Sequence, residues 1–90
     1  MKYAWNGNSL GFDRLQQRLI DRVREQVRNG ALTERSLARR TQLSQPHLHN
    51  VLKGKRFLSL TATDTVLREL NLDVLDLLDP VDLREWHRRQ

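Results

Sequence analysis

The chain has 90 residues, of which 38% are hydrophobic, no cysteine, and a net charge of +5 at pH 7. This length supports one compact domain, and the absence of cysteine excludes a disulfide framework and a thiolate metal site. No apolar run approaches the roughly 20 residues of a membrane-spanning helix. We therefore expect a soluble, cytoplasmic protein without a membrane partner.

The charges are unevenly distributed along the chain. Residues 33–56 contain six basic side chains and one acidic side chain, which gives a net charge of +5. Residues 57–85 contain seven acidic and two basic side chains, which gives −5. A clustered basic segment is typical of a nucleic-acid-binding surface. A solvated surface without a partner is the alternative interpretation.

The first predicted helix covers residues 10–28. Its apolar side chains recur every three or four residues, with arginines and acids between them, which indicates an amphipathic helix. Asn29 and Gly30 predict its end, because glycine adopts the left-handed conformation of a C-cap without a steric penalty. We expect the arginines of this helix to form a solvated face with local ion pairs to Asp21 and Glu25.

Two short helices are predicted next. Thr33 is a suitable N-cap for a helix that extends to about Arg40, and Ser44 begins another helix that ends at Gly54. Each has a short apolar stripe at helical spacing. The link between them is so short that the two helices must cross at a steep angle, which is the geometry of a helix-turn-helix.

The remaining elements are also helical. A loop over residues 55–60 leads to a fourth helix that we expect to begin near Thr61 or Thr63, and Asn71 suits a left-handed cap at its end. Asp73 then begins a short fifth helix. No segment alternates with the period of two that strands require, so the predicted class is all-α.

Pro80 prevents a simple continuation of the fifth helix. The residues after it, DLREWHRRQ, are compatible with a last helical turn or with a loose tail. The sequence pattern leaves these two interpretations open.

The run LTERSLARRTQLSQPHLHNVLKGKR, continued by LTATDTVLRELNLDVLDLL, resembles the lambda-repressor/Cro-like (XRE-type) helix-turn-helix family. Shared features include the threonine-capped helix with Leu-Ala, the Leu-Ser step, the glutamine, and the glycine followed by basic residues. The resemblance implies a compact five-helix DNA-binding domain at residues 12–78, between an N-terminal arm at 1–11 and a C-terminal extension at 79–90.

The turn departs from the family pattern at two positions. The family usually has glycine at the position of Gln42 and an apolar residue at that of Thr41. If the turn keeps a left-handed residue at Gln42, the steric cost is on the order of 1 kcal/mol.

A helical wheel divides the third predicted helix into two halves. One half carries the apolar residues and His47, and the other half faces outward. Glutamine and asparagine offer paired donor and acceptor groups that match adenine in the major groove of DNA. The predicted base contacts are Gln45, Pro46, His49 and Asn50. The alternatives are an ordinary polar surface for Gln45 and Asn50 and, for Pro46, a role confined to starting the helix.

Basic and hydroxyl side chains flank this outward half. The first backbone amides of a helix bind phosphate readily, and lysine and arginine attract it from further away. The predicted phosphate contacts are Thr33, Arg35, Arg39, Arg40, Ser44, Lys53, Lys55 and Arg56. If five or six of the cations each neutralise a phosphate, the logarithm of affinity should fall with that of salt concentration with a slope near −5.

Metal binding and catalysis have little support. His47 and His49 stand two positions apart on a helix and so point about 200° from each other, which prevents them from sharing an ion. No nucleophile motif or glycine-rich phosphate loop is present. We expect no enzyme activity, no metal and no cofactor.

Together these features predict a sequence-specific double-stranded DNA-binding transcriptional regulator of the repressor type, from a bacterium or phage and acting as a homodimer. The predicted dimer surface is the acidic, apolar C-terminal region with Leu77, Val81, Leu83 and Trp86. Packing of Trp5 against Trp86 within one chain is the alternative role for these two tryptophans.

Three other functions remain open. The chain could be an antitoxin whose acidic C-terminal half also binds a toxin. It could be the DNA-binding portion of a longer regulator. It could also be a protein-interaction adaptor that no longer binds DNA, because a fold does not fix a function.

Overall fold

The computed structural model describes residues 10–90. These residues form α1 (Phe12–Arg28), α2 (Glu34–Thr41), α3 (Gln45–Leu52), α4 (Leu60–Glu69), the 3-10 helix η1 (Val74–Leu77) and α5 (Pro80–Arg89). No strand occurs in this part of the chain. The predicted all-α class is therefore confirmed for the described residues, and none of their helices has the length and apolar character needed to cross a membrane.

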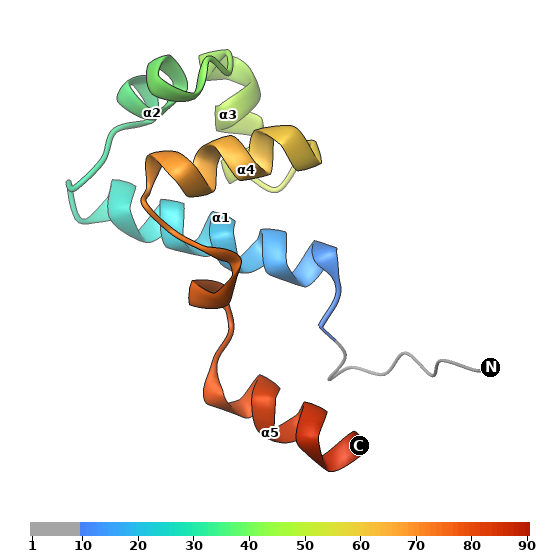
Figure 1. Ribbon diagram of the computed structural model, residues 1–90. Helices are drawn as coiled ribbons and strands as arrows, with labels where there is room; N and C mark the ends of the chain where they lie inside the picture. The colour runs from blue at the N-terminus through green and yellow to red at the C-terminus, as the bar shows by residue number, and fades with distance from the viewer. Residues whose placement is uncertain (1–9) are drawn as a thin grey trace.

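The first four helices form one packed group. Figure 1 shows α2 and α3 together at one end, α4 below them, and the long α1 below α4. The closest packing joins α2 to α3 and α4, and joins α1 to α3 and η1. In Figure 1, α5 lies apart from this group, beyond η1.

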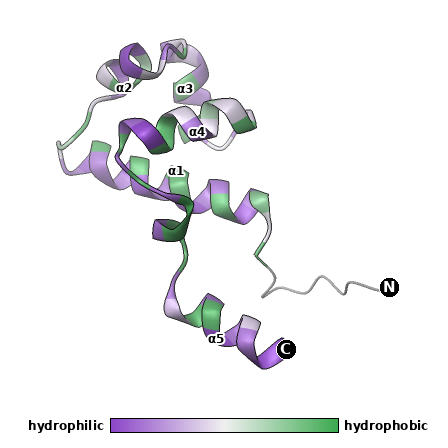
Figure 2. Cartoon of the chain, in the orientation of Figure 1, coloured by the Kyte–Doolittle hydropathy of each residue, from purple (hydrophilic) through white to green (hydrophobic). Residues whose placement is uncertain are grey.

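The core lies where the inner faces of these helices meet. Leu19 of α1, Leu37 of α2, Leu48 of α3 and Val66 of α4 are at most 1% exposed. Burial of each such side chain contributes roughly 1.5–3 kcal/mol. Hydrophobic and hydrophilic positions alternate along α1 in Figure 2, as an amphipathic helix requires. Phe12, at the start of α1, is outside this core and is 76% exposed.

Side-chain caps begin α2 and α3. The hydroxyl oxygen of Thr33 accepts a hydrogen bond of 3.0 Å from the backbone N–H of Ser36. The hydroxyl oxygen of Ser44 accepts one of 3.2 Å from His47. Both predicted N-caps are confirmed. Such caps satisfy backbone donors that have no partner within the helix and typically contribute about 1 kcal/mol.

Thr61 lies near the start of α4, as predicted, whereas the loop before the helix ends one residue earlier than expected. The helix begins at Leu60, and its N-cap is Ser59, whose hydroxyl accepts a hydrogen bond of 3.1 Å from Ala62 N–H. Thr63 lies within the helix, and its hydroxyl donates to the Ser59 carbonyl. Several hydroxyl residues follow one another here, so the sequence offered more than one plausible cap.

The predicted helix ends agree with the structure. Gly30, directly after the α1 cap at Asn29, has a φ of 83°, and Asn71 after α4 has a φ of 57°. Both are left-handed conformations that glycine and asparagine adopt more easily than other residues.

The C-terminal residues form a helix and not a loose tail. Asp73 and Asp79 each begin an element through a capping box, η1 and α5 respectively. Pro80 is the first residue of α5, where its missing N–H has no helical partner to lose. Trp86 of α5 is 50% exposed. The alternative contact with Trp5 lies outside the described residues.

Candidate nucleic-acid interface

A turn of three residues connects α2 to α3. Gln42 follows α2 with a φ of 63° and a ψ of 18°, which is the left-handed conformation considered above for this position. Leu43 packs against the core, and Ser44 caps α3. Thr41 is buried, and its hydroxyl donates to the carbonyl of Leu37 at 2.7 Å. A polar residue is therefore accommodated at this buried position.

The two sides of α3 differ as the helical wheel predicted. Leu48, Val51 and Leu52 are buried against the core. The outward residues are Gln45, Pro46 and His49, which are exposed, and Asn50, which is half-buried. These four residues and Glu34 line one shallow depression of about 340 Å³. The structure thus brings all four predicted base-contact residues onto a single surface, which we call the α3 surface.

His49 connects α3 to the start of α2. Its Nδ1 lies 3.1 Å from Oε1 of Glu34, while about half of its side chain remains exposed. The pair orients the imidazole ring on the α3 surface and also places a carboxylate beside it. Sequence inspection missed this contact, because the two residues are 15 positions apart and on different helices. His47 is half-buried, as expected for the inner edge of α3.

Most of the predicted phosphate-binding cations are exposed and without an internal partner. Within residues 10–90, the following side chains make no hydrogen bond or ion pair: Arg35, Arg39, Lys53, Lys55 and Arg56. Thr33 and Ser44 are also exposed, although their hydroxyls already cap α2 and α3. The exposed cations come from α2, from the residue that caps the end of α3 and from the loop after it, so they belong to the segments before and after α3 in the chain.

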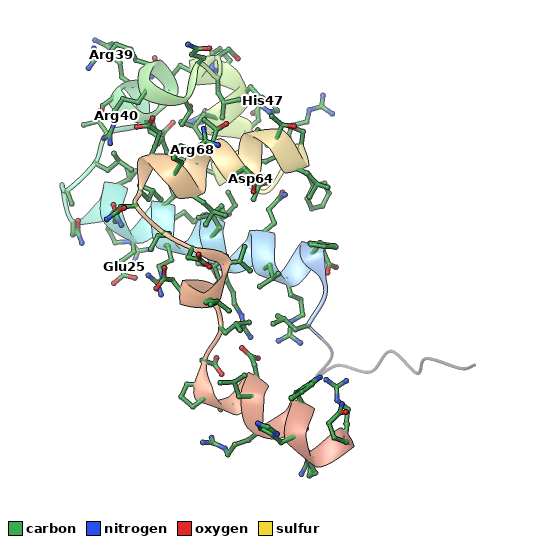
Figure 3. The ribbon with its side chains drawn as sticks, viewed as in Figure 1. Glu25, Arg39, Arg40, His47, Asp64 and Arg68 are labelled. Atoms are coloured by element: carbon green, nitrogen blue, oxygen red, sulfur yellow. The ribbon has the colours of Figure 1, made fainter. Side chains whose placement is uncertain are left out.

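Arg40 differs from its neighbour Arg39. Its Nε lies 3.1 Å from Oε2 of Glu69, and its Nη2 donates to the Glu69 carbonyl at 3.0 Å. The guanidinium therefore caps the end of α4 and stabilises the contact between α2 and α4. Figure 3 shows Arg39 at the outer edge of α2 and Arg40 nearer to α4. Of the predicted phosphate contacts, Arg40 alone has an internal carboxylate partner in the described chain.

The expectation that the α1 arginines form only a solvated face is wrong for three of them. Arg24 makes the predicted ion pair with Asp21, at 3.2 Å, but its Nε also donates to the carbonyl of Leu52 at 2.7 Å. Arg22 donates to the carbonyl of Asp76 at 2.7 Å. These arginines donate hydrogen bonds to backbone carbonyls near the ends of helices, which have no partner within the helix. Arg24 in this way stabilises the end of α3.

Arg18 attaches the C-terminal region to α1. It donates to the Leu77 carbonyl at 2.8 Å and forms a bidentate pair with Asp82, in which Nη2 and Oδ1 are 2.9 Å apart. Its hydrogen bond lowers the pKa of Asp82 from 3.8 to about 2. The pair holds the first turn of α5 against α1 and has no place on the α3 surface.

Comparison with protein-family models, with curated proteins and with solved structures finds no match for this chain. Among residues 10–90, no group of three or more His, Asp or Glu side chains is arranged to hold a metal ion.

Proposed function

We propose that the protein is a sequence-specific double-stranded DNA-binding transcriptional regulator of the repressor type. In this proposal α2, the turn at Gln42 and α3 act as a helix-turn-helix, and α3 enters the major groove. The observation that carries the proposal is the α3 surface, where Gln45, Pro46, His49 and Asn50 line one depression beside exposed cations. A cytoplasmic, nucleoid-associated location follows from this function.

The amides on the α3 surface provide the chemistry for reading bases. An asparagine or glutamine side chain can donate a hydrogen bond to N7 of adenine and accept one from its N6 amino group, and such a bidentate pair contributes about 1–3 kcal/mol of discrimination between bases. Gln45 stands at the start of α3 and Asn50 in its last turn. His49 is oriented by Glu34, and its carboxylate partner disfavours a close phosphate, so we assign His49 to a base edge.

The exposed cations provide the affinity that does not depend on sequence. Arg35 and Arg39 on one side and Lys53, Lys55 and Arg56 on the other are free to approach the two phosphate backbones of a groove. If these five each neutralise one phosphate, the salt slope should be about −4 to −5 per domain.

Selection of bound duplexes from a random pool tests this proposal. We expect one recurrent motif, and a palindrome if the protein binds as a dimer. Asn50→Ala should relax preference at one base position, whereas Lys53→Ala should weaken all duplexes and reduce the salt slope by about 1. Arg68→Ala removes the same charge from α4, away from the α3 surface, and serves as the control. Unchanged binding in both test variants would show that the α3 surface is not the interface.

The same measurements separate the alternatives. An adaptor without DNA binding would show no steep salt-dependent affinity for any duplex. An antitoxin would bind its operator and also a toxin, and the observation that favours a protein partner is the exposed apolar surface of the acidic half. Leu75, Val81, Leu83 and Trp86 are each at least 50% exposed there.

A further inference from the structure

Glu34 and His49 form a polar contact between α2 and α3 at the edge of the α3 surface. Oε1 of Glu34 lies 3.1 Å from Nδ1 of His49, and the two side chains are 28% and 51% exposed. Both residues line the depression of about 340 Å³ that also contains Gln45, Pro46 and Asn50. The contact therefore lies among the residues assigned to base reading.

The Glu34 side chain can only accept hydrogen bonds. Glutamate is a carboxylate at neutral pH, and a carboxylate has acceptor oxygens and no donor. Arg24, Arg28 and Lys53 line a second depression together with Glu34 and His49, but none of these cations forms an ion pair with Glu34. Within residues 10–90, the carboxylate therefore has His49 as its partner.

This acceptor decides which nitrogen of the His49 ring carries the hydrogen atom. A neutral imidazole has one N–H donor and one acceptor nitrogen. Because the carboxylate cannot donate, Nδ1 carries the hydrogen and donates it to Glu34. Nε2 is then the acceptor nitrogen, and it makes no hydrogen bond within residues 10–90. His49 therefore retains a free acceptor nitrogen on the α3 surface.

The packing of α2 against α3 holds the two side chains in place. These helices are among the most closely packed elements, and Leu37 and Leu48 on their inner sides are 0% and 1% exposed. Because this core fixes both backbones, the contact requires the ordering of only two side chains. A recognition group that is held by a second residue on a rigid element has the fixed orientation that specific binding requires.

We propose that Glu34 sets the base specificity of His49, by fixing the tautomer in which Nε2 accepts a hydrogen bond from a base amino group. This inference rests on the proposed function. In the major groove, adenine and cytosine offer the N6 and N4 amino groups, whereas guanine and thymine offer the O6 and O4 oxygens. His49 therefore reads adenine or cytosine, and Glu34 is its positioning residue. The other tautomer, with a hydrogen on Nε2, would have the opposite preference.

The tautomer is measured in the free protein by ¹⁵N NMR of the imidazole rings at pH 8, where a histidine with an ordinary pKa is neutral. We expect His49 to have a protonated Nδ1 and an unprotonated Nε2. Glu34→Ala should shift both nitrogen signals toward those of a mixture of tautomers. The chain has three histidines, so the spectrum of His49→Ala identifies the signals of His49.

The base preference is measured with the same variants by selection of duplexes at pH 8. His49→Ala should lose preference at one base position, which identifies the position that His49 reads. There the original protein should favour adenine or cytosine over guanine or thymine by roughly five- to tenfold, and Glu34→Ala should reduce this ratio to about twofold or less. In the His49→Ala background, Glu34→Ala should have no further effect on the preference.

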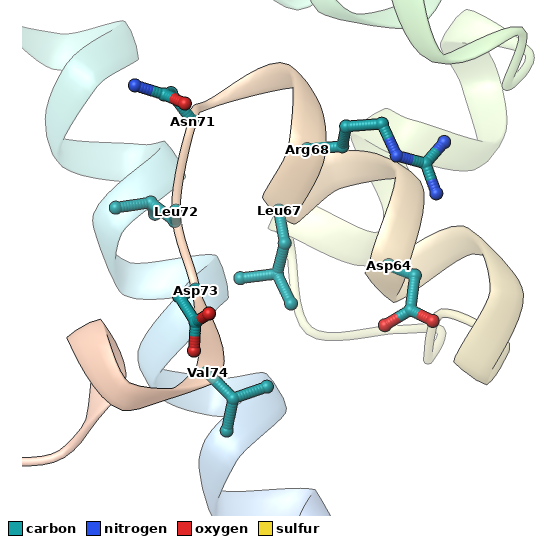
Figure 4. Close-up of a pocket in the computed structure, with 7 residues that line it drawn as sticks. All are labelled: Asp64, Leu67, Arg68, Asn71, Leu72, Asp73 and Val74. Atoms are coloured by element: carbon teal, nitrogen blue, oxygen red, sulfur yellow. The ribbon is translucent and has the colours of Figure 1, made fainter.

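Asp64→Ala is the matched control for the loss of a negative charge. Asp64 is exposed and makes no ion pair within residues 10–90, and Figure 4 shows its carboxylate on α4. Removal of either carboxylate should strengthen binding to every duplex through charge alone. Only Glu34→Ala should change the preference at the position that His49 reads. Circular dichroism should report unchanged helix content for all variants, because none of these residues belongs to the core.

Three results overturn the inference and leave the proposed function standing. They are a hydrogen on Nε2 in the original protein, duplex binding whose base preference His49→Ala does not alter, and a preference that Glu34→Ala leaves unchanged. A protein that binds no duplex rejects the proposed function, and the assignment of a base to His49 is then rejected with it.

Discussion

The basic segment, residues 33–56, and the acidic segment, residues 57–85, use their charges in opposite ways. In the basic segment, five of the six cations have no partner within the described chain, and Arg40 is the exception. In the acidic segment, most carboxylates have internal roles. Asp73, Asp76, Asp79 and Asp82 form two capping boxes, and Glu69 holds Arg40.

This difference shows that a segment's net charge is a weaker guide to a binding surface than the partners of its individual charges. Carboxylates at helix N-termini are stabilised by the helix dipole and by backbone donors, so they belong to the fold. Cations that face only water contribute little to the stability of the fold. They are therefore available to bind an external anion such as DNA phosphate. Asp64 is the acidic counterpart of these cations, because it is exposed and makes no ion pair within residues 10–90.

The largest expected effect concerns the core that the two segments share. Leu48 is 1% exposed on the inner side of α3. Leu48→Ala should lower the free energy of unfolding by about 2–5 kcal/mol, because it removes buried methyl groups and leaves a cavity. Urea unfolding followed by circular dichroism measures this loss.

Gln45→Ala, on the outward side of the same helix, is the matched control and should change stability by no more than about 0.5 kcal/mol. If the two substitutions had equal effects on stability, the division of α3 into an inner and an outward side would be wrong.

The next largest change in the free energy of unfolding is expected at the ion pair that attaches the acidic segment to α1. The Arg18 and Asp82 side chains are only 24% and 14% exposed, and the pKa of Asp82 is lowered from 3.8 to about 2. Its carboxylate therefore contributes stability above about pH 4, and this contribution is lost as the pH falls toward 2. At neutral pH, Asp82→Asn should reduce the free energy of unfolding by about 2 kcal/mol.

Urea unfolding of both proteins from neutral pH to pH 2 checks this pH dependence. The difference between them should narrow below about pH 4, where the original carboxylate becomes protonated in the unfolded chain. A difference that stays constant down to pH 2 would mean that the ion pair is not its source.

Two neighbouring arginines of the basic segment sharpen the comparison further. Arg39→Ala should weaken duplex binding and reduce the salt slope by about 1, with little change in stability. Arg40→Ala should instead lower stability by about 1 kcal/mol, since it removes the cap on the Glu69 carbonyl. Fluorescence anisotropy with labelled duplexes at several salt concentrations, combined with urea unfolding, measures both quantities. Equal salt slopes for the two variants would contradict the assignment.

The sequence predicted the helices well because the signals are local. The periodicity of α1, the caps Thr33, Ser44 and Asp73, and the stop at Gly30 each depend on residues within one or two helical turns. The outward face of α3 followed from the same periodicity. These signals required no knowledge of how distant segments meet.

The contacts that the sequence did not reveal join residues far apart. The side chain of Gln16 donates to the Leu58 carbonyl and accepts from its N–H, across 42 positions. Arg18 reaches Asp82 across 64 positions. Periodicity predicts which side of a helix an arginine occupies. It does not predict which other helix packs against that side, because this depends on the whole fold. For this reason Arg39 and Arg40 looked equivalent in the sequence.

The smallest expected change in the free energy of unfolding concerns two residues with left-handed backbone conformations, one from each segment. Gln42 in the basic segment has a φ of 63°, and Asn71 in the acidic segment has a φ of 57°. Glutamine carries the steric cost of this conformation in full, whereas the short side chain of asparagine tolerates it better. Gln42→Gly should therefore raise the free energy of unfolding by up to about 1 kcal/mol, and Asn71→Gly should raise it by less.

Urea unfolding of the two glycine variants measures this ordering. Gln42 lies in the turn and not on the α3 surface, so Gln42→Gly should leave the preferred DNA sequence unchanged while it stabilises the protein. An equal or larger gain at Asn71 would show that the strain of the turn is relieved elsewhere. A changed DNA preference would mean that the Gln42 side chain itself belongs to the interface, which would extend the α3 surface into the turn.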